Sequence, residues 1–330
     1  MRLIRVNNLL LLCVLQYLTK YFIIEQLVIS STLSSTKFLY LVISTTTIAA
    51  AGYIINDLYD INIDQLNNKR NVISNGLVSI KTAWILYMTL NTIGLYLGFF
   101  LAFTINQPWL SLIFLYSVIS LWLYSKNMKK AFLIGNIQVG ILASLSIMNV
   151  ALFDLFPILN NANISHHTIN NNIIYNLQAS FIIILSYSIF SFLFTLIREI
   201  IKDIEDVEGD QKQGATTLIV RLGYKKTKWI ILSLCSIVLS LIIFFQYLQY
   251  SLISTKFTLN HKGEQYNDIE FWGANTESII YTLIIEIILI IFMYKVLYAY
   301  KKQQFSFLSK LAKIIILIGI LSIPIFSYFN

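Results

Sequence analysis

The chain has 330 residues, of which 57% are hydrophobic and only 12% are charged, and its formal net charge is +8. Soluble domains carry about 25% charged residues, so this composition excludes an ordinary soluble protein and indicates one that is solvated by lipid. The two cysteines and three histidines have no metal-ligand spacing, and they give no sign of a disulfide framework or a zinc site.

Apolar segments recur along the whole chain. A helix needs about 20 mostly apolar residues to cross the hydrocarbon core of a bilayer. The segments that meet this requirement are residues 8–29, 36–56, 83–104, 108–124, 131–156, 174–197, 229–250, 278–297 and 307–327. The sequence therefore predicts an all-α, polytopic membrane protein of about nine transmembrane helices, forming a single domain over residues 1–330.

Basic residues are distributed unevenly between the connections that join these segments. Of the 24 lysines and arginines, 20 lie in one alternate set of connections, which starts with the N-terminal segment. The other set holds only Lys37, Lys256 and Lys262. Because basic residues accumulate on the cytoplasmic side, we expect a multi-pass protein of a cell inner membrane of bacterial or archaeal type, with the N-terminus in the cytoplasm. Nothing alternates aromatic and basic residues as a nucleic-acid platform would, and no obligate protein partner is evident.

Nine of the 16 acidic residues fall in two short windows, residues 56–64 and residues 198–210. Each window contains the pattern Asp-x-x-Asp-x-x-x-Asp, and the two copies are offset by 146 residues. The aspartates of the two copies are Asp57, Asp60 and Asp64, and then Asp203, Asp206 and Asp210. On a helix, this spacing places the three carboxylates of one copy on the same face.

Three carboxylates on one helix face repel one another, and the repulsion grows near the low-dielectric membrane. A divalent cation would neutralise them, and Mg²⁺ prefers one or two carboxylates together with substrate phosphates. The alternative is a pair of acidic, solvated helix ends. The repeated spacing and the position of both windows on the predicted cytoplasmic side favour magnesium.

Basic and polar residues border both windows at the same predicted depth. Tyr124 and Lys129 end the fourth span, while Arg198 and Lys202 belong to the second window. Lysine and arginine bind phosphate oxygens through charge-assisted hydrogen bonds. We therefore predict that these residues contact a diphosphate bridged to the aspartates by magnesium, with the active site on the cytoplasmic side.

These motifs resemble those of the UbiA superfamily of membrane prenyltransferases. Asn56-Asp57-x-x-Asp60-x-x-x-Asp64 is similar to the first family signature, and Asp206-x-x-x-Asp210 is similar to the second. Tyr124-Ser125-x-x-x-Lys129 resembles a third, shorter motif, and Arg5 resembles the basic start of the first helix. Residues 198–210 look most like the branch named for geranylgeranylglycerol-phosphate geranylgeranyltransferase.

The resemblance implies a UbiA-like prenyltransferase fold and magnesium-dependent transfer of a prenyl group from an allylic prenyl diphosphate to a lipid or aromatic acceptor. Geranylgeranyl diphosphate is a candidate donor, and geranylgeranylglyceryl phosphate is a candidate acceptor. The implied magnesium ligands are Asp57, Asp60, Asp64, Asp206 and Asp210. The implied substrate-binding residues are Asn56, Arg5, Arg70, Tyr124, Lys129, Arg198 and Lys202. Asp203 either binds metal or acts as a base toward the acceptor.

Two other readings of the sequence compete with the prenyltransferase. An ion-coupled secondary transporter would also carry membrane carboxylates and an internal repeat, but its carboxylates usually lie near the midplane, whereas these lie at span ends. A non-catalytic assembly factor that keeps the family fold is the third reading, and the complete aspartate motifs argue against it.

Overall fold

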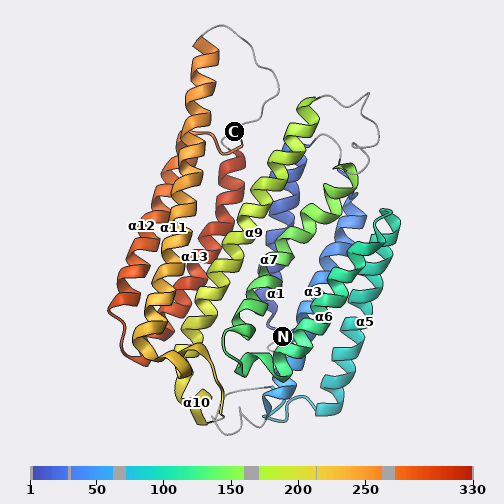
Figure 1. Cartoon of the computed structure of the whole chain (residues 1–330). Coiled ribbons are helices and arrows are strands. Elements are labelled where there is room, and N and C mark those ends of the chain that lie inside the picture. The colour runs from blue at the N-terminus through green and yellow to red at the C-terminus, as the bar shows by residue number, and fades with distance from the viewer. Residues whose placement is uncertain are drawn as a thin grey trace.

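The computed structural model describes residues 3–28, 31–61, 72–159, 171–212, 214–261 and 272–328, and these are predominantly helical (Figure 1). The helices in chain order are α1 (Val6–Thr19), α2 (Glu25–Leu27), α3 (Ser35–Tyr59), α5 (Ile80–Thr104), α6 (Ser111–Lys126), α7 (Ile134–Asp154), α9 (Asn171–Glu205), α10 (Val207–Lys212), α11 (Leu218–His261), α12 (Thr276–Leu297) and α13 (Lys302–Tyr328). A π-helical turn (Lys20–Ile24) joins α1 to α2, and short 3₁₀ turns precede α6 and α7.

Nine helical segments in the described part of the chain are long and apolar enough to cross a membrane. They coincide with the nine predicted spans, and the protein is an all-α, multi-pass membrane protein. The largest differences lie at three helix ends: α9 continues to Glu205, whereas its predicted span ends at 197, and α11 runs from Leu218 to His261, whereas its predicted span covers 229–250. Hydropathy misses these ends because the extensions are rich in charged and polar residues. Gly223, with φ 74°, kinks α11 within its extension.

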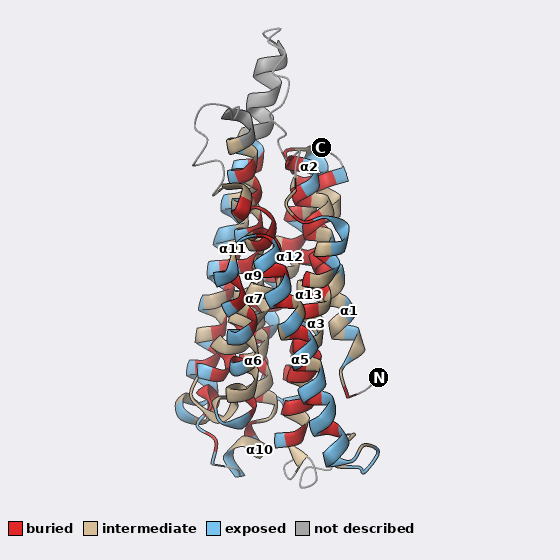
Figure 2. Cartoon of the chain, turned by 90° about the vertical axis from the view of Figure 1, so that its right-hand side faces the viewer, coloured by how far each residue is buried: buried red, intermediate tan, exposed pale blue. Residues whose placement is uncertain are grey.

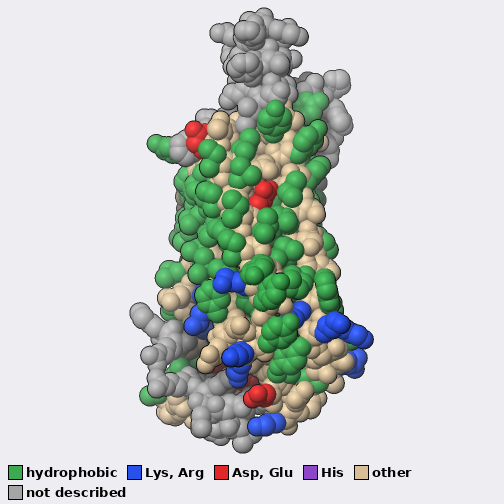
Figure 3. Space-filling model, turned by 90° about the vertical axis from the view of Figure 1, so that its left-hand side faces the viewer, with side chains coloured by type: hydrophobic (Ala, Val, Ile, Leu, Met, Phe, Trp, Pro, Cys, Tyr) green, Lys and Arg blue, Asp and Glu red, His purple; other side chains and the backbone are tan. Residues whose placement is uncertain are grey.

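The long helices run alternately up and down, with the N-terminus near the lower end of the bundle and the C-terminus at the upper end (Figure 1). The lower end therefore collects the ends of α3, α6 and α9 together with the starts of α7, α11 and α13. On the face drawn in Figure 3, Lys and Arg side chains gather in the lower half, below a largely hydrophobic surface. We call this lower end, which carries Arg5, Asp60, Lys129 and Lys202, the charged end.

Six of these helices form a closed ring. Going around it, α1 packs against α3, α3 against α6, α6 against α7, α7 against α9, α9 against α13, and α13 against α1 again. Outside the ring, α5 packs on α3 and α6, while α11 and α12 pack on α9 and α13. Buried residues (red) and exposed residues (pale blue) both occur along the long helices (Figure 2). The ring thus surrounds a common interior.

Local sequence explains where several helices start and how closely they approach. Ser79 Oγ accepts the Thr82 N–H at 3.1 Å, and Asn275 Oδ1 accepts the Ser278 N–H at 2.7 Å, so both residues cap helix N-termini. At Gly98 on α5, an added Cβ would lie 2.4 Å from the Phe114 ring of α6. The glycine therefore lets the Phe114 ring pack directly against the α5 backbone.

A buried ion pair lies at the opposite end of the ring. Lys20 Nζ is 2.5 Å from Asp154 Oδ2, and the two side chains are 1% and 0% exposed. Lys20 also donates to the Leu33 carbonyl (3.1 Å), and Asp154 Oδ1 accepts the Leu33 N–H (3.0 Å). The pair ties the π-helical turn after α1 to the end of α7 and to the segment before α3.

Candidate active site

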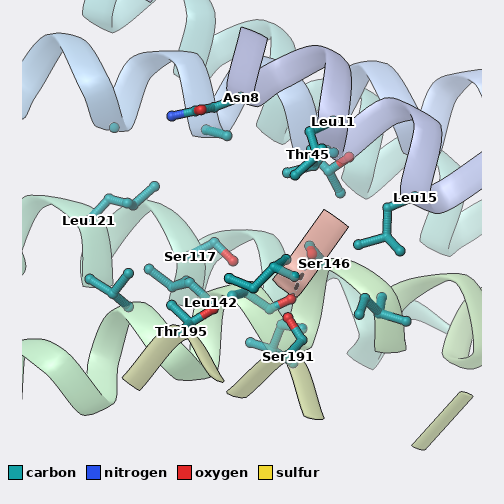
Figure 4. Close-up of a pocket in the computed structure, with 18 of the residues that line it drawn as sticks. Asn8, Leu11, Leu15, Thr45, Ser117, Leu121, Leu142, Ser146, Ser191 and Thr195 are labelled. Carbon is teal, nitrogen blue, oxygen red and sulfur yellow. Dashed lines mark hydrogen bonds between the residues drawn. The ribbon is translucent and has the colours of Figure 1, made fainter. Parts of the chain in front are cut away.

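The ring encloses a cavity of about 390 Å³, which is lined by α1, α3, α6, α7, α9 and α13. On α9 its lining runs from Tyr187 to Lys202, which at 1.5 Å per residue is about 22 Å along the helix. Leucines and the hydroxyl groups of Thr45, Ser146 and Ser191 lie around the same space (Figure 4). Toward the charged end the lining becomes cationic and polar.

The first acidic window meets the start of α1 at the charged end. Arg5 Nη2 is 3.3 Å from Asp57 Oδ1, and its guanidinium carbon lies 4.8 Å from the centre of the Tyr53 ring. Asn8, one turn further along α1, donates to the Tyr53 hydroxyl (3.2 Å) and accepts from Lys313 Nζ of α13 (3.1 Å). Arg5, Asn8, Tyr53 and Lys313 all line the cavity.

Asp60 connects the same window to the loop between α6 and α7. Its Oδ1 forms an ion pair with Lys129 Nζ, and its Oδ2 accepts from Asn56 Nδ2 at 2.9 Å. Both side chains of the ion pair are less than one fifth exposed. The structure therefore brings together three predicted site residues, Asn56, Asp60 and Lys129, which come from two different helix ends.

The second acidic window lies along the end of α9 and on α10. Glu199 Oε1 accepts from Arg198 Nη1 (2.8 Å) and from Lys202 Nζ (2.7 Å), and all three residues line the cavity. Asp203 accepts from Asn136 Nδ2 of α7 at 2.7 Å. Asp210 on α10 accepts from Thr217 at 3.4 Å.

The loop between α6 and α7 lies against both windows. Lys129 pairs with Asp60. The carbonyl of the neighbouring Lys130 accepts the N–H of Thr216 (2.8 Å), which follows Asp210 by a few residues. Tyr124, at the end of α6, lines the cavity and lies within electrostatic range of Asp60 and carboxylates of α9. The two windows, 146 residues apart in sequence, therefore flank one short connection.

Carboxylate and amide oxygens are the polar groups that the two windows supply, and hard cations such as Mg²⁺ select oxygen donors of this kind. The donor set fits magnesium. Within the described residues, no three Asp, Glu, His or Cys side chains lie close enough together to hold a metal ion, and most of these carboxylates are engaged with Arg, Lys, Asn or Thr. Asp64 and Arg70 lie outside the described residues. The metal-binding role of the aspartates stays a prediction.

Sequence reasoning missed several polar residues of this region. Glu199 stood within the second window but received no role, because it lies outside the Asp-x-x-Asp-x-x-x-Asp pattern. Asn136 and Lys313 are polar residues in or beside apolar segments. The signal available for Glu199 was its spacing, since Thr195, Glu199 and Lys202 fall on one face of a helix.

Known proteins are similar to this chain in sequence. Residues 21–259 match the model of the UbiA prenyltransferase family. The chain is 32% identical, over 64% of its length, to digeranylgeranylglyceryl phosphate synthase of Sulfurisphaera tokodaii, and the match spans just under two thirds (66%) of that protein.

Solved structures share the fold over nearly the whole chain. A structure described as digeranylgeranylglyceryl phosphate synthase in membranes has a TM-score of 0.64 and 23% identity, covering 98% of this chain and 96% of that one. A UbiA homologue from Archaeoglobus fulgidus, bound to GPP and Mg²⁺, has a TM-score of 0.52 and 17% identity, covering 98% of both chains. With the family model matching well over half of its length, this chain belongs to the UbiA prenyltransferase family.

Proposed function

We propose that this single-domain protein transfers a prenyl group from an allylic prenyl diphosphate, such as geranylgeranyl diphosphate, to a lipophilic acceptor, with geranylgeranylglyceryl phosphate as the first candidate. One observation carries the proposal: two aspartate windows and a set of cations meet at one end of a ring whose interior becomes mainly apolar further in. A diphosphate suits the charged end, and an isoprenoid tail suits the interior. The relative named as a digeranylgeranylglyceryl phosphate synthase supports the choice of acceptor.

Each group of residues has a task in this reaction. Asp57, Asp60, Asp64, Asp206 and Asp210 would hold magnesium, which supplies positive charge to the departing diphosphate. Cationic and polar side chains would bind its remaining oxygens and stabilise charge as it develops. These are Arg5, Asn56, Arg70, Tyr124, Lys129, Arg198 and Lys202. In the structure Arg5 and Lys129 neutralise Asp57 and Asp60, so donor binding would exchange these carboxylate partners for phosphate partners.

The transporter alternative lacks support. A secondary transporter binds its substrate and coupling ions near the bilayer midplane. In the described residues, the charged side chains that line the cavity lie toward one end of it, while Leu15, Thr45 and Ile147 are among those lining the part further in.

Purified protein in lipid nanodiscs, given labelled geranylgeranyl diphosphate, should form a prenyl ether with geranylgeranylglyceryl phosphate. Product with 4-hydroxybenzoate instead would overturn the acceptor assignment.

Activity should require a divalent cation. Several carboxylates facing an anionic diphosphate repel it unless a cation bridges the two, so excess chelator should abolish product formation and added Mg²⁺ should restore it. Product can be followed by thin-layer chromatography of the labelled lipid. Undiminished turnover in chelator would contradict the metal-bridged role of the aspartates.

We also propose that the charged end faces the cytoplasm, as the uneven distribution of basic residues indicates. A single cysteine at Lys212, which is exposed on α10, should react with a membrane-impermeant maleimide only after cells are opened. A cysteine at Ser35, exposed at the start of α3 and at the opposite end of the bundle, should react in intact cells. Labelling of both positions from the same side would refute this orientation.

A further inference from the structure

One carboxylate is set apart from the others by its position. Glu199 is the one acidic side chain of the described residues that lines the cavity. Its side chain is 12% exposed, and its Oε1 accepts from both Arg198 and Lys202. Its other oxygen, Oε2, accepts no hydrogen bond from the described part of the chain and is not sealed from the cavity. Glu199 therefore has one oxygen that fixes its orientation and one that is open to a ligand.

The hydroxyls beside Glu199 on the same helix are also open. Ser180, Ser186 and Ser188 of α9 each donate to the carbonyl four residues earlier, as serine in a helix commonly does. Ser191 and Thr195, which line the cavity, make no such bond within the described residues. Their spacing of four residues continues to Glu199, so the three side chains follow one face of α9. Figure 4 draws Ser191 and Thr195 among the residues around the cavity.

The aspartates near the charged end lie outside the cavity lining, and Asp57, Asp60 and Asp203 are each engaged with a neighbouring side chain. Asp57 pairs with Arg5, and Asp60 pairs with Lys129. Asp203, which the sequence left open as metal ligand or base, accepts from Asn136 and does not line the cavity. Of these groups, Glu199 alone lines the cavity, together with Arg198 and Lys202 of the cationic mouth and Thr195 one turn further in.

We propose that Glu199 takes the proton of an acceptor alcohol, and that Thr195 helps to orient that alcohol; this inference rests on the proposed prenyl transfer. The bond between C1 of the prenyl group and the diphosphate oxygen breaks, and its electron pair leaves with the diphosphate. A lone pair of the alcohol oxygen forms the new bond to C1. The O–H bond of the alcohol breaks, and its proton goes to Glu199 Oε2. An ether, diphosphate and protonated Glu199 result, and the proton then returns to solvent.

Glu199→Gln separates this role from a structural one. The glutamine Oε1 still accepts from Arg198 and Lys202, but the amide cannot take a proton. General-base catalysis typically contributes 10²- to 10⁴-fold, so ether formation should fall by about 100-fold or more. Magnesium-dependent binding of the labelled donor, measured directly, should stay close to that of wild type. Donor that ionises without capture by the alcohol should instead appear as free prenyl alcohol.

Matched variants complete the experiment. Glu208→Gln makes the same chemical change at an exposed position on α10 and should leave ether formation unchanged, while Glu199→Asp should recover part of the activity. If Glu199→Gln lost donor binding in parallel with turnover, the proposal would be overturned. Glu199 would then only hold Arg198 and Lys202 in position. A selective loss of capture in Asp203→Asn, with Glu199→Gln unaffected, would assign the proton to Asp203. Wild-type protein that binds donor but forms no ether with any acceptor would refute the proposed function itself.

Discussion

Asp60→Asn and Asp206→Asn are each expected to remove nearly all turnover, by about 100-fold or more, because a lost metal ligand costs several kcal/mol of transition-state stabilisation. Asp60 lies at the end of α3, where it pairs with Lys129, and Asp206 lies between α9 and α10. If both aspartates serve one diphosphate, each substitution should also weaken magnesium-dependent donor binding. Steady-state kinetics and direct donor binding on purified protein measure the two effects.

The double variant tests whether the two windows act as one site. Losses from residues that act as a unit are strongly non-additive, so Asp60→Asn with Asp206→Asn should be scarcely slower than either single variant. Glu277→Gln, exposed at the start of α12 at the opposite end of the bundle, is the charge-matched control and should keep full activity. If the two losses multiply, or if either properly folded single variant stays active, the single-site proposal is wrong.

The second large effect is expected on stability. Lys20→Met leaves the fully buried Asp154 carboxylate without its cation, and breaking one partner of a buried pair costs about 3–5 kcal/mol. Asp154 also accepts the Leu33 N–H, and Lys20 donates to the Leu33 carbonyl. Loss of the Lys20 side chain should therefore loosen the connection between α2 and α3. The apparent melting temperature of the detergent-solubilised protein should fall well below that of wild type.

A second substitution should reverse part of this loss. In Lys20→Met with Asp154→Asn, the uncompensated charge is gone, while the asparagine oxygen can still accept the Leu33 N–H. This variant should therefore melt above Lys20→Met alone. Lys37→Met, at the same end of the bundle, removes a lysine that has no ion pair in the described structure and should change the melting temperature little. Equal melting of Lys20→Met and wild type would mean that the pair contributes little.

The fold was largely predictable from sequence because lipid imposes a simple rule: a spanning helix must be long and apolar. That rule found all nine spans, and its largest misses are where helices extend past the apolar segment, at the end of α9 and at both ends of α11. Backbone hydrogen bonding continues a helix into water, and hydropathy does not detect this. The kink at Gly223 likewise follows from backbone conformation.

The part of the site formed by the two aspartate windows was predictable, because the same aspartate spacing occurs twice in the sequence. The two aspartate patterns were recognisable because three carboxylates recur at the same spacing, and the structure brings both windows to the charged end. Lys20 and Asp154 were not predictable as a pair, because each lies within an apolar segment that has few charges, and their contact joins residues 134 apart. Glu199 was overlooked because its importance depends on facing the cavity, which requires the packing of six helices.

The closed ring has a consequence for how the protein is made. α1 is synthesised first and α13 last, yet they lie side by side, and Lys313 donates to Asn8 across 305 residues of sequence. Until α13 inserts, the interior between α1 and α9 lacks one wall, and a growing chain would expose that polar-rimmed groove to surrounding lipids. Chains truncated before α13 should therefore be captured by membrane quality control more readily than full-length chains.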